Sequence, residues 1–203
     1  MLKKLRLLQT AAIQEIQKRI ALYEDMKAYK ELYYMLFDQL HRFSYSFVKS
    51  NEAAEEIVSD VFIKIWEIRA RLTDIDNLKV YIYTITKNFS INYIHRNYKN
   101  VALSIDEMDI EPQVNVGNPE ELFISAEILS RIREGIRQLP PQCRLIFQLV
   151  KEDGLKYKEV ASILHISPLT VRNQLAIAIR KIAASFPAKS PSGAVLMKRL
   201  PTV

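Results

Sequence analysis

Hydrophobic residues between positions 154 and 183 recur at helical spacing and are interrupted by one short turn. Val160, Ala161 and Leu164 mark the inner face of a first helix, and Ile166 follows the turn. A second helix repeats apolar residues at intervals of four, three and four, which places them on one buried stripe. That stripe consists of Val171, Leu175, Ala178 and Ile182. Two short helices joined by so tight a turn predict a helix-turn-helix, a pattern typical of DNA-binding domains.

The ends of these two helices carry the signals that such a turn requires. Ser167 offers an N-cap hydroxyl to the second helix, and Pro168 follows at N1, where its missing N–H costs nothing. In the first helix, Glu159 supplies the acid of a capping box. Lys156 at the N-cap cannot accept a hydrogen bond, so we expect a helix start weaker by about 1 kcal/mol. His165 stands at the turn, where we expect a left-handed backbone at a cost of roughly 1–2 kcal/mol.

The outer arc of the second helix is polar and basic, with no acidic residue from position 174 to 184. Arginine, asparagine and glutamine can pair bidentately with base edges in a major groove. The arc consists of Thr170, Arg172, Asn173, Gln174, Ile177, Arg180 and Lys181. A solvated outer face would have the same polarity, but the preceding turn and the lack of acids favour contact with DNA.

The segment from Asn51 to Arg69 is helical by the same period and carries an acidic ridge. Its buried stripe consists of Ala54, Ile57, Val58, Val61, Ile65 and Ile68. The ridge lies almost opposite and consists of Glu52, Glu56, Asp60 and Glu67, with Ile63 among them. Solvated faces usually mix signs for i,i+4 pairing, so the ridge favours docking onto a basic helical partner, with simple solvation as the alternative. Trp66 lies beside the ridge and is either a core anchor or an interface residue.

The next helix, at about 78–96, is expected to bury an apolar stripe and to expose a basic and aromatic side. The stripe consists of Leu78, Ile82, Ile85, Phe89 and Tyr93. The other side shows Lys79, Tyr83, Thr84, Lys87, Asn88, Ser90 and His95, with Tyr98 and Lys99 beyond it. Such a surface can hold phosphates and stack on unpaired bases, although lysines and tyrosines also serve simply to cover a core edge. The absence of acids from position 77 to 101 favours nucleic acid.

Composition limits the classes of protein that fit. With 203 residues, about half of them hydrophobic, the chain suffices for two small helical domains. A formal charge of +6 favours polyanionic partners. The single cysteine, Cys143, excludes an internal disulfide and fits a core position in a reducing cytoplasm. The three histidines lack ligand spacing, so we expect no metal, and we expect neither a signal peptide nor a membrane span.

Charge and proline divide the chain into five parts. Residues 102–121 are acidic, contain glycine and proline, and lack a sustained period, which predicts a flexible linker. We therefore expect an all-α fold with two small domains. The expected parts are an N-terminal helical extension at 1–21, a helical domain at 22–100, an acidic linker at 101–121, a helix-turn-helix domain at 122–186, and a disordered tail at 187–203.

These segments together resemble the extracytoplasmic-function (ECF) subfamily of sigma-70-type RNA polymerase sigma factors. AEEIVSDVFIKIWE at 54–67 resembles the family's core-binding helix, and NLKVYIYTITKNFSINYIHR at 77–96 resembles its minus-ten recognition helix. Residues 127–184 resemble its minus-thirty-five domain. The resemblance extends from about Leu22 to Phe186 in the family's order. It implies a non-enzymatic protein without a cofactor, built from a region 2-like bundle and a region 4-like helix-turn-helix.

The resemblance also implies roles for individual residues. The chain would contact core RNA polymerase at the clamp helices of its largest subunit and at its flap. The residues that contact the clamp helices would be Glu56, Ser59, Asp60, Ile63 and Glu67. The loop at 73–77 and the helix after it would capture bases of the melted minus-ten element through Asn77, Lys79, Tyr83, Lys87, Asn88, His95 and Arg96. The minus-thirty-five groove would be contacted by Pro168, Thr170, Arg172, Asn173 and Ile177, with Arg180 and Lys181 on phosphates. Family members are commonly held inactive by an anti-sigma factor, often membrane-linked.

Two other functions fit parts of the pattern. A stand-alone transcriptional regulator would use the helix-turn-helix on operators, usually as a dimer, with the first domain sensing or dimerising. An enzyme acting on nucleic acid would need clustered carboxylates, a phosphate-binding glycine loop or a nucleophile with a base, and the sequence shows none of these. We therefore expect a promoter-specificity subunit that joins core RNA polymerase, binds both promoter elements and assists DNA melting.

Overall fold

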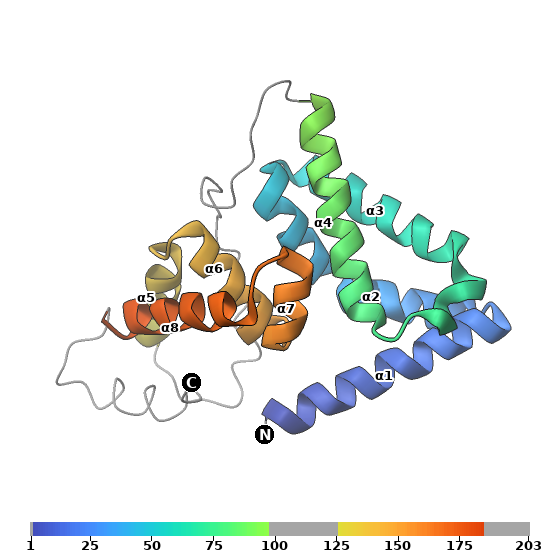
Figure 1. Cartoon of the computed structure of the whole chain (residues 1–203), viewed down its shortest axis with the longest axis horizontal. Coiled ribbons are helices and arrows are strands. Elements are labelled where there is room, and N and C mark those ends of the chain that lie inside the picture. Colours follow the sequence, from blue (N-terminus) through green and yellow to red (C-terminus); the bar gives the residue numbers. More distant parts are fainter. Residues whose placement is uncertain (1, 98–125, 185–203) are drawn as a thin grey trace. The chain divides into compact units, whose positions relative to one another are not determined.

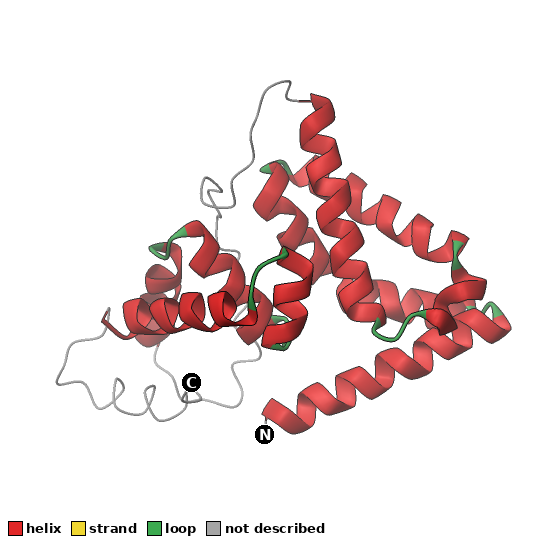
Figure 2. Cartoon of the chain, viewed as in Figure 1, coloured by secondary structure: helices red, strands yellow, loops and turns green. Residues whose placement is uncertain are grey.

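The structure is a computed structural model that describes residues 2–97 and 126–184, and all regular secondary structure within those residues is helical (Figures 1 and 2). This confirms the predicted all-α fold class. The chain forms two compact units, Met1–Ala102 and Leu103–Val203. The linker predicted at 101–121 and the tail predicted at 187–203 lie outside the described residues.

The first unit is built around one central helix. Its described elements are α1 (Leu2–Tyr23), α2 (Met26–Val48), α3 (Asn51–Glu67), a short 3-10 helix η1 (Arg69–Asp74) and α4 (Leu78–Asn97). The central helix α2 packs against α1, α3 and α4. It buries an i,i+4 row completely: Leu32, Leu36 and Leu40, followed by Phe43. This row lies in the core between α2 and the helices α3 and α4, which also pack against each other.

Side-chain caps set the starts of three helices in this unit. The Asp25 carboxylate accepts hydrogen bonds from Lys27 N at 2.8 Å and Ala28 N at 3.1 Å, and so caps α2. Ser50 Oγ accepts from Ala53 N at 3.1 Å and caps α3. Asn77 Oδ1 accepts from Val80 N at 3.1 Å, which fixes the start of α4 directly after η1. Asp, Ser and Asn are strongly preferred at this position because their oxygens satisfy otherwise unpaired helix N–H groups.

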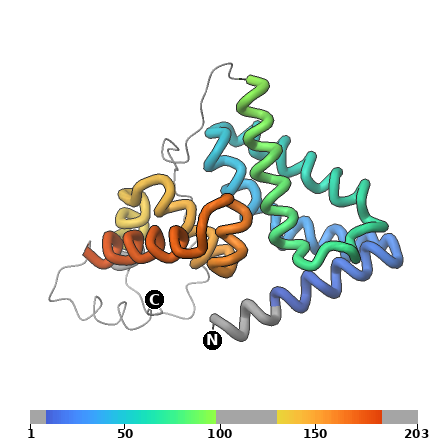
Figure 3. Tube along the Cα trace, viewed as in Figure 1, coloured from blue at the N-terminus to red at the C-terminus, as the bar shows by residue number. Residues whose placement is uncertain are grey.

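The N-terminal segment forms helix α1, which is part of the first unit's core. Ile13, Ile16 and Ile20, spaced by three and four residues, are buried, and the helix packs against η1 and α2. The chain reverses direction between α1 and α2, as the trace in Figure 3 shows. Glu24 takes a positive φ of 47° at this reversal. Helix α1 therefore packs against the segment that links α3 to α4.

The second unit contains the predicted helix-turn-helix. Its described elements are α5 (Ala126–Arg137), α6 (Pro141–Phe147), one π-helical turn η4 (Gln148–Glu152), α7 (Tyr157–Leu164) and α8 (Pro168–Ala184). Helix α8 packs against α5, α6 and α7 through the predicted stripe, all four residues of which are buried: Val171, Leu175, Ala178 and Ile182. The predicted inner face of α7, namely Val160, Ala161 and Leu164, is buried as well.

Candidate nucleic-acid and protein interfaces

The turn between α7 and α8 has the backbone that the sequence predicted. His165 lies in the left-handed region at φ 56° and ψ 44°, and its N–H donates to Ala161 O. Ser167 Oγ accepts from Thr170 N at 2.9 Å, so Ser167 caps α8. At the start of α7, the Lys156 side chain provides no acceptor, whereas the Glu159 carboxylate accepts from Lys156 N at 2.7 Å. Half of the capping box is therefore present, as expected from the residue types.

The outer arc of α8 is only partly exposed: Pro168 is exposed, whereas Thr170 and Ile177 are half-buried. Arg172 and Asn173 are exposed near the helix N-terminus, and Arg180 and Lys181 are exposed near its end. Gln174 is half-buried, and its Oε1 accepts a hydrogen bond from Cys143 Sγ at 2.8 Å. Cys143 is buried, which confirms its predicted core position, and burial raises the pKa of its thiol.

One residue of this surface was missed by the sequence reasoning. Leu169, between Pro168 and Thr170, is 62 % exposed at the start of α8. It places a large apolar side chain on the outer surface of the first turn of α8. The signal available in the sequence was a large apolar residue outside the buried stripe.

The acidic ridge on α3 is exposed along its whole length. Glu52, Glu56, Ser59, Asp60, Ile63 and Glu67 are all exposed, with Ile63 at 57 %. Two of its acids have local partners: Glu67 pairs with Lys64 at 3.0 Å, and Glu52 accepts from the Ser50 hydroxyl at 2.7 Å. The Glu52 backbone N–H and the Ser50 hydroxyl hold the pKa of Glu52 below its ordinary value. No described residue forms an ion pair or hydrogen bond with the side chain of Glu56 or Asp60.

Trp66, beside the ridge, helps to fasten α3 to α2. Its ring is half-buried and packs edge-on against Tyr29 with centroids 5.0 Å apart. The Arg69 guanidinium lies 4.9 Å from the Trp66 ring centroid, within the range of a cation–π contact. Tyr29 also donates its hydroxyl hydrogen to Phe62 O at 2.8 Å. These contacts give Trp66 the core-anchor role, one of the two roles considered from the sequence.

The structure corrects the predicted orientation of α4. Tyr83 is fully buried, and its hydroxyl donates to Gln39 Oε1 at 3.2 Å. Lys87 is only 5 % exposed, and its burial lowers its pKa. The predictions that Tyr83 and Lys87 face DNA are therefore wrong, because both side chains lie inside the bundle. Ile85, Phe89 and Tyr93, predicted to be buried, are half-buried at the surface.

A seam of hydroxyl groups explains why α4 buries this side. Thr86 donates to Ile82 O and Ser90 donates to Thr86 O, each at 2.8 Å, which satisfies both hydroxyls within the helix. Ser90 Oγ also lies 3.0 Å from Ser44 Oγ on α2. Small polar residues that satisfy one another can be buried at little cost. The predicted exposure of Ser90 is therefore also wrong.

A continuous exposed surface remains on the opposite side of α4 and on the loop before it. Asn77, Asn88, His95 and Arg96 are exposed on it. Lys79 is half-buried and, by i,i+3 and i,i+4 spacing, lies on the same side of α4 as the buried Ile82 and Tyr83. Tyr81, half-buried, and Asn92, exposed, share the face of Asn88 by i,i+7 and i,i+4 spacing, and neither was predicted as part of this surface. Thr73, Asp74 and Asp76 in the preceding loop are exposed. Tyr98 and Lys99, predicted to continue this surface, lie outside the described residues.

Two other kinds of site are absent from the described residues. Among them, no group of three or more His, Cys, Asp and Glu side chains is arranged to hold a metal ion. None of the described helices combines the length and the hydropathy that crossing a bilayer requires.

Each of the two units matches a known protein family. Residues 32–99, in the first unit, match the sigma-70 region 2 family, and residues 129–182, in the second unit, match the sigma-70 region 4 family. The two matches occur in the family's order, and they fall on the acidic ridge with α4 and on the helix-turn-helix. The chain is therefore a sigma-70-type protein.

Similarity to individual proteins narrows the sigma-70 class to its ECF subfamily. The chain is 25% identical over 156 residues to the ECF RNA polymerase sigma factor SigM of Bacillus subtilis (strain 168), a match that covers 77% of this chain and 93% of SigM. It is 25% identical over 127 residues to the ECF RNA polymerase sigma-E factor of Escherichia coli (strain K12), covering 59% of this chain and 66% of that protein. The chain belongs to the ECF sigma factors, which act in transcription initiation and are not enzymes.

Two solved structures share the fold. CnrH, solved in complex with the cytosolic domain of CnrY, aligns over 88% of this chain and 99% of its own, with a TM-score of 0.52 and 19% identity. The sigma factor RpoE, solved in complex with the anti-sigma factor NepR from Bartonella quintana, aligns over 81% and 100%, with a TM-score of 0.52 and 18% identity. At these identities the likeness shows the fold alone.

Proposed function

We propose that the acidic ridge of α3 docks this sigma factor on the clamp helices of the largest subunit of core RNA polymerase. The contact residues are Glu56, Ser59, Asp60, Ile63 and Glu67. The observation that carries the proposal is an apolar side chain, Ile63, left 57 % exposed among acids on a helix whose other side is wholly buried. Acids at Glu56 and Asp60 suit a basic helical partner, and Ile63 supplies apolar area that a purely solvated face does not need.

The second unit contacts the minus-thirty-five element through α8 and meets the polymerase flap. Pro168, Thr170, Arg172, Asn173 and Ile177 lie over the bases, and Arg180 and Lys181 hold phosphates. Arg172 and Asn173 are exposed within two turns of the N-terminus of α8, the part of a recognition helix that reaches base edges. Leu169 adds an exposed methyl-bearing side chain that suits the methyl group of thymine.

The first unit captures single-stranded bases of the minus-ten element. The contact residues are Asn77, Lys79, Asn88, His95 and Arg96, together with the half-buried Tyr81 and the exposed loop before α4. Stacking of an unpaired base on an aromatic ring contributes roughly 1–3 kcal/mol, which offsets the cost of opening the duplex. The protein thus assists melting by binding the opened strand and makes or breaks no covalent bond.

The two surfaces lie on separate units, and their linkage makes binding cooperative. Once one element is bound, the other unit is held at a high effective concentration, so the pair binds more tightly than either unit alone. We propose that the acidic linker at 101–121 joins the domains expected at 22–100 and 122–186, with α1 packed into the first of them. The protein would act in the cytoplasm, where core RNA polymerase is found. Because CnrH and RpoE were each solved with a bound protein, we also propose an anti-sigma partner for this chain.

Runoff transcription with purified core RNA polymerase tests this function. The full chain is added to core enzyme on fragmented genomic DNA from its source, and transcript starts are mapped. We expect a limited set of starts that require the chain and share two spaced elements upstream. Core enzyme alone and the Asp60→Lys variant are the controls. Absence of any start that depends on the chain would overturn the proposal, and DNA binding without polymerase would instead favour a stand-alone regulator.

A further inference from the structure

One buried amide on α1 binds the backbone of the loop that precedes α4. Gln17 is 6 % exposed, and its Nε2 donates hydrogen bonds to Leu72 O at 2.5 Å and to Ile75 O at 2.8 Å. Both carbonyls lie more than fifty residues away in the chain, at the end of η1 and just beyond it. A buried amide that satisfies two distant carbonyls is a specific structural contact, because leaving such groups unpaired is costly.

The loop held by Gln17 is anchored at three further points. Ile75 N donates to Leu72 O at 3.0 Å, the Leu72 side chain is fully buried, and Asn77 caps α4. Between these points, the side chains of Thr73, Asp74 and Asp76 are exposed. Gln17 therefore fixes the backbone at the base of the loop while the side chains that face solvent stay available.

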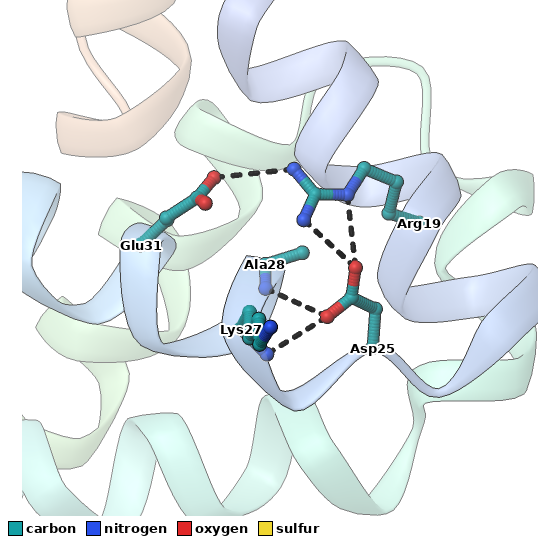
Figure 4. A network of polar contacts seen from close by, with 5 residues as sticks. All are labelled: Arg19, Asp25, Lys27, Ala28 and Glu31. Carbon is teal, nitrogen blue, oxygen red and sulfur yellow. Dashed lines mark hydrogen bonds and ion pairs between the residues drawn. The ribbon is translucent and has the colours of Figure 1, made fainter.

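Helix α1 is itself fixed, so that it can act as a brace. Figure 4 shows Arg19, two residues after Gln17, donating two hydrogen bonds to Asp25 Oδ2 at 3.0 and 2.8 Å, while Asp25 Oδ1 caps α2. Arg19 also pairs with Glu31 at 3.3 Å. At the same corner, Glu24 pairs with Arg69, the first residue of η1, at 3.2 Å. Polar contacts at both ends of η1 thus connect it to α1 and to the corner between α1 and α2.

We propose that α1 is a brace for the base-capture loop at 73–77 and that Gln17 is its positioning residue, so that sequence preference at the minus-ten element depends on a side chain that contacts no DNA. This inference rests on the proposed capture of single-stranded DNA by the first unit. Pre-organised backbone lowers the ordering cost of binding, and a recognition group works only when the residues around it hold it close to its productive geometry. Loss of Gln17 should therefore reduce the preference among bases while leaving other contacts intact.

The test uses two variants of the full chain bound to core RNA polymerase. Gln17→Leu fills nearly the same volume without a donor, and Leu72 O keeps its bond from Ile75 N, so the fold should persist. Gln17→Ala removes the same donor and also leaves a cavity. A brace predicts the same loss of base preference for both variants, although Gln17→Ala unfolds at a lower temperature. If Gln17 acts through packing alone, the loss of base preference should be larger in Gln17→Ala, the less stable variant, than in Gln17→Leu.

The probe is a fluorescent single-stranded DNA pool with a randomised segment, selected on wild-type holoenzyme and sequenced. For the selected sequence and its single-base variants, the ratio of dissociation constants measures base preference. We expect both Gln17 variants to lower that ratio by about tenfold at the bases nearest the loop, equivalent to about 1.4 kcal/mol. Affinity for core polymerase and for duplex minus-thirty-five DNA should match wild type. Ile20→Val, which thins the core under α1 and keeps both hydrogen bonds, should keep the wild-type ratio.

The outcomes separate the brace from the function on which it rests. If both Gln17 variants keep the wild-type ratio of dissociation constants, the brace is wrong and the proposed function still stands. An equal fall in Ile20→Val would also overturn the brace, because general loosening would then suffice. If wild-type holoenzyme selects no sequence from the pool, single-strand capture is wrong, and the brace fails with it.

Discussion

Replacing Ile63 by alanine isolates the apolar part of the proposed polymerase contact. Ile63 is 57 % exposed on the acidic ridge of α3. Burying an isoleucine side chain fully contributes about 1.5–3 kcal/mol, so covering the exposed part contributes roughly 0.6–1.3 kcal/mol after allowance for the methyl that alanine keeps. The expected loss in affinity for core RNA polymerase is about 3- to 9-fold. The free energy of unfolding should change little, because the side chain packs against little in the free protein.

A buried neighbour on the same helix provides the matched control. Ile65 is fully buried two positions further on, and Ile65→Val should lower the free energy of unfolding by about 0.5–1.5 kcal/mol. The folded fraction of that variant should bind polymerase as wild type does. Titration of labelled protein with core enzyme, followed by fluorescence anisotropy, gives the affinities, and thermal unfolding gives the stabilities. Wild-type affinity for Ile63→Ala, or a loss of stability in place of affinity, would refute the reasoning.

Three further substitutions test the DNA surfaces and the corrected orientation of α4. Lys87→Met should raise the free energy of unfolding by about 1 kcal/mol, since burial disfavours the lysine charge and lowers its pKa, and no described acid pairs with it. A lower melting temperature, or weaker single-strand binding, would show that the ammonium group is needed. Arg172→Ala should cost about 1–3 kcal/mol and relax preference at one base step, which unchanged promoter ranking in transcription would contradict. Lys181→Ala should weaken all sequences alike and reduce the salt dependence by about one unit, whereas an altered base preference would rule out a phosphate contact.

Local sequence signals were sufficient to predict the helix-turn-helix. Ser167 and Pro168 specify the start of α8, the spacing from Val171 to Ile182 specifies its buried side, and His165 is one of the few residues other than glycine suited to the turn. Each of these features acts within a few residues of its own position. The acidic ridge of α3 was equally accessible, because its acids and the buried apolar residues of α3 lie on opposite sides of the helix.

The features that were not predicted from the sequence depend on contacts between residues far apart in the chain. Apolar residues occur on several sides of α4, so their spacing did not identify the buried one. The deciding contacts come from α2, where Ser44 meets Ser90 and Gln39 accepts from Tyr83. Gln17 likewise resembles any polar residue of an amphipathic helix until the carbonyls of Leu72 and Ile75 are placed beside it. Hydrogen bonds between segments far apart in sequence leave no local period to detect.

Retention of core RNA polymerase by the immobilised full-length protein tests the docking proposal most directly. The measurement compares wild type with Asp60→Lys, which reverses a charge at the centre of the ridge, and with Glu15→Lys, which makes the same change at an exposed position of α1. The acidic ridge predicts that Asp60→Lys loses most of the retained polymerase, while Glu15→Lys retains as much as wild type. Equal retention by all three proteins would contradict the role of the ridge in docking.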